Sequence, residues 1–60
     1  MDLFLFMEDF DNAELDEVGW EEQMIDAVID YNEQYDTEHI PMRAIRQYRS
    51  WRDKQNQPEE

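Results

Sequence analysis

The sequence lacks cysteine altogether, has one glycine and two prolines, and has five basic residues against 17 acidic ones. Without cysteine a disulfide framework and a thiolate zinc site are both excluded, so packing alone, within the chain or across a dimer, must stabilise it. A length of 60 residues allows one small domain with a limited core. The longest apolar run, Leu3 to Met7, is far shorter than the ~20 residues that span a bilayer. We therefore expect a single-domain, soluble, cytoplasmic protein that does not bind membranes.

The formal net charge of −12 restricts the classes of partner. Such a chain is repelled by nucleic acid and by anionic lipid, whereas it meets basic surfaces rapidly. The charge is also uneven, because residues 1–42 contain 14 acidic and no basic side chains, and all five basic ones lie in residues 43–60. These properties predict a basic protein partner and no direct contact with nucleic acid.

High charge is typical of disordered chains, but the aromatic content argues for a fold. Two Trp, three Tyr, three Phe and four Met recur at helical intervals and can bury a large area. The segment 55–60 has no apolar residue and includes a proline. We therefore expect one helical domain over residues 1–54 and a disordered tail over 55–60.

The clearest predicted element is an amphipathic helix over residues 20–35, with a start between Asp16 and Gly19. At about 100° per residue, its apolar side chains fall on one face: Trp20, Met24, Ala27, Val28, Tyr31 and Tyr35. The opposite face carries a line of four carboxylates, called here the acidic ridge: Glu22, Asp26, Asp30 and Glu33, with Glu21 to one side.

A second helix is predicted over residues 41–54, because Pro41 suits the first position of a helix. Its apolar face comprises Ala44, Ile45, Tyr48 and Trp51. Four arginines recur every third residue and so wrap around the helix: Arg43, Arg46, Arg49 and Arg52. They suit either neutralisation of the acidic helix or insertion into a nucleic-acid groove, and the acidity of the remaining chain favours neutralisation.

The segment 1–10 fits two secondary structures. Leu3, Phe6, Met7 and Phe10 match the spacing of a helix face, but Leu3 to Met7 is also an unbroken apolar run of strand length. A lone strand leaves its backbone groups unpaired unless it pairs with a second copy or with a target. A short helix is therefore favoured, and the sequence predicts an all-α bundle of two to three helices.

Residues suited to catalysis or metal binding are scarce. The single serine, Ser50, and the single histidine, His39, are about 16 Å apart by helix rise, too far for a nucleophile and its base. An EF-hand loop starting at Asp9 fails at three positions, occupied by Ala13, Glu14 and Trp20. The sequence therefore predicts neither an enzyme nor a metal or cofactor site.

Neighbouring like charges on a helix destabilise it by some tenths of a kcal/mol each. Such self-repulsion suggests that a basic partner binds the acidic ridge, which is therefore the main functional candidate. In size and acidity the chain resembles the small decoy proteins with which phages and mobile elements occupy the DNA or RNA sites of host enzymes. This compositional resemblance implies an anti-defence inhibitor that acts as a DNA mimic. Its partner would be the basic surface of a nucleic-acid-binding enzyme or complex, contacted through Glu21 and the acidic ridge.

The alternative is a small regulatory or structural subunit, with a homodimer as one form. It would bind through an exposed apolar helix face made of aromatic side chains: Phe4, Phe6, Phe10, Trp20 and Trp51. The effect of salt on binding affinity distinguishes the two hypotheses, because higher ionic strength weakens an electrostatic interface and does not weaken an apolar one.

Overall fold

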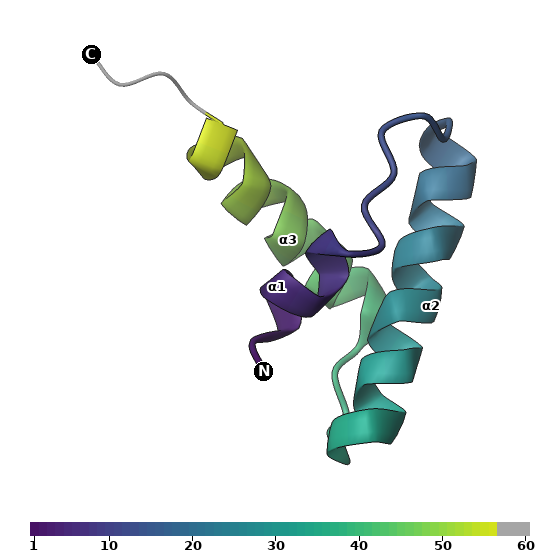
Figure 1. Cartoon of the computed structure of the whole chain (residues 1–60), viewed down its shortest axis with the longest axis vertical. Coiled ribbons are helices and arrows are strands. Elements are labelled where there is room, and N and C mark those ends of the chain that lie inside the picture. Colours follow the sequence, from purple (N-terminus) through teal and green to yellow (C-terminus); the bar gives the residue numbers. More distant parts are fainter. Residues whose placement is uncertain (57–60) are drawn as a thin grey trace.

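Over residues 1–56 the protein is a bundle of three helices. The computed structural model describes residues 1–56, which form α1 (Leu3–Glu8), α2 (Glu17–Tyr35) and α3 (Pro41–Asn56) (Figure 1). The all-α prediction is confirmed, including the choice of a helix for the N-terminal segment. Because α3 continues to Asn56, the expected tail does not begin at residue 55, and its remainder, 57–60, lies outside the described residues.

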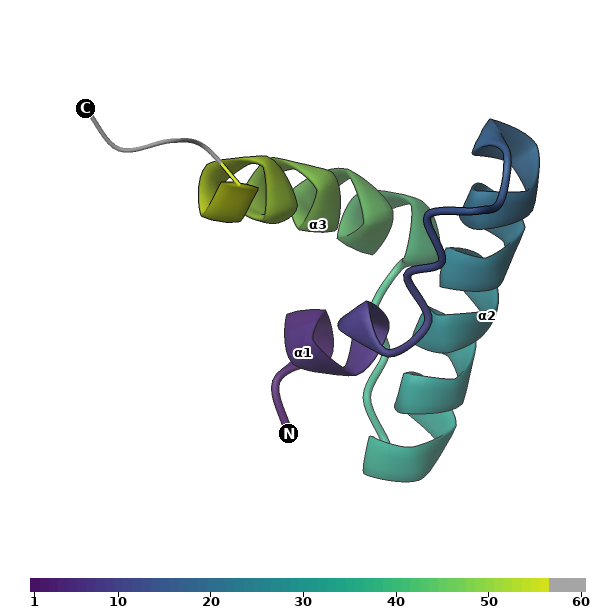
Figure 2. The same cartoon turned by 45° about the horizontal axis from the view of Figure 1, so that its top comes forward.

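The arrangement of the helices leaves one side of α2 uncovered. In both views α1 and α3 lie on the same side of α2, and α3 is steeply inclined to it (Figures 1 and 2). Within residues 1–56, no other helix covers the opposite side (Figures 1 and 2). In the same part of the chain, no helix combines the length and apolar character that crossing a bilayer requires.

An aspartate caps the N-terminus of each of the first two helices, α1 and α2. The Asp2 carboxylate accepts a hydrogen bond from the Phe4 amide (3.2 Å), and the Asp16 carboxylate accepts one from the Gly19 amide (2.7 Å). Each satisfies an amide of the first turn that has no partner within the helix. Glycine matters at position 19, because an added Cβ would lie 3.0 Å from the Asp16 oxygen. The observed start of α2 at Glu17 agrees with the predicted window of 16–19.

The turn from α2 to α3 is organised by Asn32. Its amide oxygen accepts from the Thr37 hydroxyl (2.8 Å) and the His39 amide (3.0 Å), and its NH₂ donates to the His39 carbonyl (3.0 Å). Asp36 ends α2 in the left-handed region (φ 55°), which aspartate tolerates better than most residues. The sequence pattern did not indicate these contacts.

The core lies where the inner face of α2 meets α1 and α3. Met7, Met24 and Val28 are fully buried, and Ile45 and Tyr48 pack into the same cluster. The predicted apolar faces of both long helices are therefore confirmed, with Trp51 at the edge of the core, except that Tyr35 at the end of α2 is 41% exposed. Burial of such side chains contributes on the order of 1.5–3 kcal/mol each, which makes this cluster the main source of stability.

The prediction that five aromatic residues are exposed is wrong for two of them. Phe6 is only 9% exposed, because α1 is a helix that turns this ring edge-on toward Tyr31, with ring centres 5.3 Å apart. Trp20 is 6% exposed, because Arg49 and Arg52 of α3 lie over its indole ring. Phe4, Phe10 and Trp51 are partly buried against the core. The single chain thus hides much of the apolar surface that was expected to need a partner.

Candidate functional site

The acidic ridge lies along the uncovered side of α2. Glu22, Asp26, Asp30 and Glu33 are all exposed, and within residues 1–56 none has a cationic side chain within 4 Å. Asp30 accepts a local hydrogen bond from the Gln34 side-chain amide (3.2 Å). The ridge therefore presents four uncompensated charges on one helix.

The arginines of α3 neutralise other carboxylates. Arg49 forms an ion pair with Glu17 and lies 3.8 Å from Glu21, both in the first turns of α2. Arg52 pairs with Asp11 at 3.0 Å. Glu21, predicted beside the ridge, is therefore turned toward α3 and is partly neutralised there. The expected neutralisation of the acidic helix is confirmed for Arg49 but does not reach the ridge, whereas Arg52 neutralises Asp11 in the loop before α2.

Two arginines near the start of α3 are not used in this way. Arg43 and Arg46 are exposed, and within residues 1–56 neither has a carboxylate within 4 Å. Arg46 borders a hollow between α2 and α3 together with Glu21 and Met42. These two arginines therefore add exposed positive charge near the start of α3.

A network centred on Asp11 joins the loop before α2 to both long helices. The Asp11 carboxylate accepts hydrogen bonds from the Trp20 indole N–H (2.7 Å), the Tyr48 hydroxyl (2.7 Å) and Arg52 (3.0 Å). Its side chain is 16% exposed. The sequence did not single out Asp11, because its partners come from positions 20, 48 and 52. No local spacing could indicate them.

Both acidic groups in this network have shifted pKa values. Partial burial favours the neutral form of Asp11, but the hydrogen bonds from Tyr48, Trp20 and Arg52 outweigh it and hold its pKa below the ordinary 3.8. Burial and the neighbouring Asp11 carboxylate raise the pKa of Tyr48 above its ordinary value of 10.0. Near neutral pH the pair is therefore a carboxylate that accepts from a phenol, which suits a structural contact.

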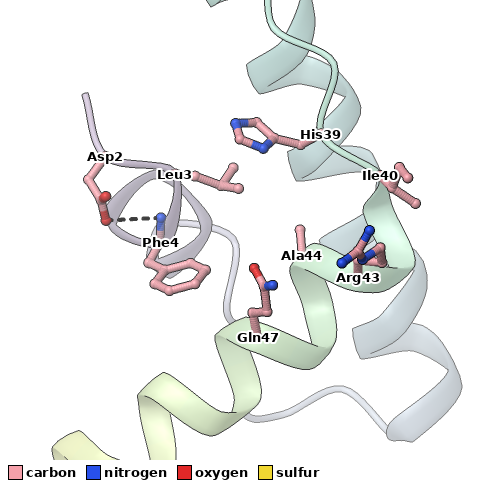
Figure 3. Close-up of a pocket in the computed structure, with 8 residues that line it drawn as sticks. All are labelled: Asp2, Leu3, Phe4, His39, Ile40, Arg43, Ala44 and Gln47. Atoms are coloured by element: carbon pink, nitrogen blue, oxygen red, sulfur yellow. Dashed lines mark hydrogen bonds between the residues drawn. The ribbon is translucent and has the colours of Figure 1, made fainter.

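A pocket of about 340 Å³ lies between the start of α1 and the start of α3 (Figure 3). Its lining combines apolar walls with an acid, an arginine and a histidine: Asp2, Leu3, Phe4, His39, Ile40, Arg43, Ala44 and Gln47. The Asp2 carboxylate is already engaged with the Phe4 amide (Figure 3). Ser50 lines a different hollow beside Trp51, so neither pocket holds both Ser50 and His39.

Within residues 1–56, no three His, Asp or Glu side chains are grouped so that they could hold a metal ion. No protein-family model, no curated protein and no solved structure matches the chain. The charge distribution and the arrangement of the helices are therefore the features from which a function can be inferred.

Proposed function

We propose that this protein binds the basic surface of a nucleic-acid-binding protein through the acidic ridge and inhibits it as a decoy for nucleic acid. The observation that carries the proposal is that Glu22, Asp26, Asp30 and Glu33 are exposed and unpaired within residues 1–56. The same molecule places arginines on Asp11, Glu17 and Glu21. Charges left uncompensated in this way are available to a partner.

The ridge is a costly arrangement for an isolated chain. Like charges three or four residues apart on a helix destabilise it by roughly 0.2–0.5 kcal/mol per pair. A cationic partner removes this repulsion on binding and gains four attractive contacts. Because the carboxylates lie on a packed helix, they are already ordered, and binding loses less entropy than it would with a flexible acidic tail.

The acidic ridge carries fewer charges per unit length than nucleic acid does. From Glu22 to Glu33 the helix axis rises about 16 Å, a length over which duplex DNA carries about ten charges. Four carboxylates therefore imitate only part of a duplex. The proposal predicts a contact with a limited basic patch, with a salt dependence that reflects no more than four ion pairs.

The proposal is tested with two variants of equal net charge. The ridge variant carries Glu22→Gln, Asp26→Asn, Asp30→Asn and Glu33→Gln. The control variant carries four matched changes at exposed acids elsewhere: Asp9→Asn, Glu14→Gln, Glu38→Gln and Asp53→Asn. Both change the net charge from −12 to −8 (−12 + 4), so any difference between them depends on position.

The three proteins are immobilised and exposed to the same cell extract, and the retained proteins are identified. The proposal expects at least one nucleic-acid-binding protein that the wild type and control variant retain, that the ridge variant loses, and that duplex DNA or RNA displaces. That protein's activity should fall when wild type is added. Equal loss with both variants would show a general charge effect and contradict the proposal, as would retention by the ridge variant.

A further inference from the structure

The uncovered side of α2 carries apolar side chains beside the acidic ridge. Val18 is 67% exposed and Ile29 is 46% exposed, and Ile25 between them is partly buried and packs against the core with one edge. Within residues 1–56 no other helix reaches this side (Figure 1). Val and Ile are weaker helix formers than straight-chain residues, so helix formation alone does not account for them here.

The spacing of these residues is that of a helix-packing surface. Val18, Glu22, Ile25 and Ile29 follow one another at intervals of four, three and four. At about 100° per residue they fall within a stripe about 60° wide. Alternating steps of three and four are what place one helix's side chains against a second helix. We call these four residues the outer seam.

Charge lies to one side of the outer seam and within it. Glu33 and Asp26 follow its edge at about 40° and 60° from Ile29, and Glu22 lies in the stripe itself. An occupant that buries Val18 and Ile29 must therefore supply cations for these three carboxylates, because an unpaired buried carboxylate is costly. Apolar residues flanked by Lys or Arg on one edge meet that requirement.

We infer that the outer seam docks a basic amphipathic α-helix of the partner, with its apolar residues on Val18, Ile25 and Ile29 and its cations on the acidic ridge. This inference rests on the proposed function and names the structural element of the partner that is bound. It also accounts for the sparse ridge, because apolar burial supplies affinity that four charges do not.

A second copy of the chain is a poor occupant of this surface. In a parallel pairing about a two-fold axis, Glu22 of one protomer meets Glu22 of the other in the seam. In an antiparallel pairing the edge that carries Asp26 and Glu33 meets its own copy. Either arrangement places carboxylates against carboxylates, which is destabilising.

The probe is a synthetic helical peptide with Leu at the alternating three- and four-residue positions and Lys along one edge. A matched peptide keeps the Lys residues and replaces each Leu with Ala, which preserves helicity and charge. Binding to wild type is measured by fluorescence anisotropy at low and at moderate salt. A peptide attracted by charge alone binds in both forms, whereas the inference requires the Leu residues.

Two variants separate apolar docking from charge. The seam variant carries Val18→Gln and Ile29→Gln, and the control carries Leu5→Gln and Ile40→Gln, which are also exposed apolar residues. Circular dichroism is used to check that each variant remains helical. The inference expects the seam variant to bind the Leu peptide about ten-fold more weakly or worse, since each lost contact removes buried apolar area. The Leu5 and Ile40 control should bind like wild type.

The outcomes separate this inference from the proposed function. Equal binding of the two peptides, or of the seam variant and wild type, would overturn the helix-docking inference, and a ridge-dependent protein partner would still support the proposed function. If, in addition, the ridge variant bound the protein partner as wild type does, the helix-docking inference and the proposed function would both be overturned. Sedimentation showing a wild-type dimer that the seam variant abolishes would assign the surface to a second copy and overturn the inference.

Discussion

Two groups of carboxylates lie on opposite sides of α2 and have different environments. Asp11, Glu17 and Glu21 face the arginines of α3, and Asp11 also accepts hydrogen bonds from Trp20 and Tyr48. The four residues of the acidic ridge face away from α1 and α3 and have no cation within 4 Å in residues 1–56. The first group is used to hold the helices together, whereas the second adds only repulsion to the isolated chain.

The comparison shows that sequence position alone does not give an acidic residue its role. Glu21 and Glu22 are adjacent in the chain, yet Glu21 lies beside Arg49 and Glu22 lies in the outer seam. The about 100° turn between neighbouring residues of a helix accounts for this difference. Stability measurements on matched variants should therefore separate the two groups.

The largest effect is expected at Asp11. Asp11→Asn should lower the free energy of unfolding by about 2 kcal/mol, because an amide NH₂ cannot accept from Tyr48 or Arg52 as the carboxylate does. Urea unfolding followed by circular dichroism measures the change, with Asp9→Asn as a neighbouring exposed control. Equal stability of Asp11→Asn and wild type would show that the network contributes nothing.

Wild type and Asp11→Asn should also differ in how their stability responds to acid. The pKa of Asp11 is held below 3.8 in the folded state, so the ionised carboxylate stabilises the fold fully above its unfolded pKa. That contribution is lost as the pH falls below 3.8 and through the lower folded value. The difference in unfolding free energy between wild type and Asp11→Asn should be constant above this range and shrink within it. A difference that grows on acidification would contradict the assigned direction of the shift.

The acidic ridge should show an effect of the opposite sign. The ridge variant removes three like-charge pairs at spacings of three or four residues, so its free energy of unfolding should rise by about 1 kcal/mol at low salt. Added salt should reduce this gain, because it screens exposed charges. Thermal unfolding at two ionic strengths tests both expectations. A destabilised ridge variant would mean that these carboxylates support the fold after all.

The smallest effect is expected at Glu17, although it forms an ion pair with Arg49. The two side chains are 69% and 40% exposed, and exposed ion pairs contribute about 0.5 kcal/mol or less. Arg49 also lies 4.8 Å from the centre of the Trp20 ring, a contact that does not involve Glu17 and should persist in Glu17→Gln. Urea unfolding should place Glu17→Gln close to wild type. A loss as large as that at Asp11 would remove the distinction between exposed and partly buried pairs.

The long helices, their apolar faces and the acidic ridge could be predicted from the sequence, because each depends on spacings of three and four residues. The Asp11 network could not, since its partners are separated by nine to 41 residues and meet only after the helices pack. The burial of Phe6 and Trp20 also depended on tertiary contacts, with Tyr31 and with the arginines of α3. The outer seam could not be recognised from the spacing alone, because the exposure of Val18 and Ile29 depends on which side of α2 the other helices cover.

The central claim is that the acidic ridge is a contact surface for a basic partner. The most direct measurement is the association rate constant of the wild type, the ridge variant and the control variant with the protein that wild type retains, each at low and moderate salt. The account predicts that the wild type and control variant associate rapidly at low salt and more slowly as salt rises. The ridge variant should associate slowly at both. Equal rates and equal salt dependence for the ridge and control variants would contradict the account.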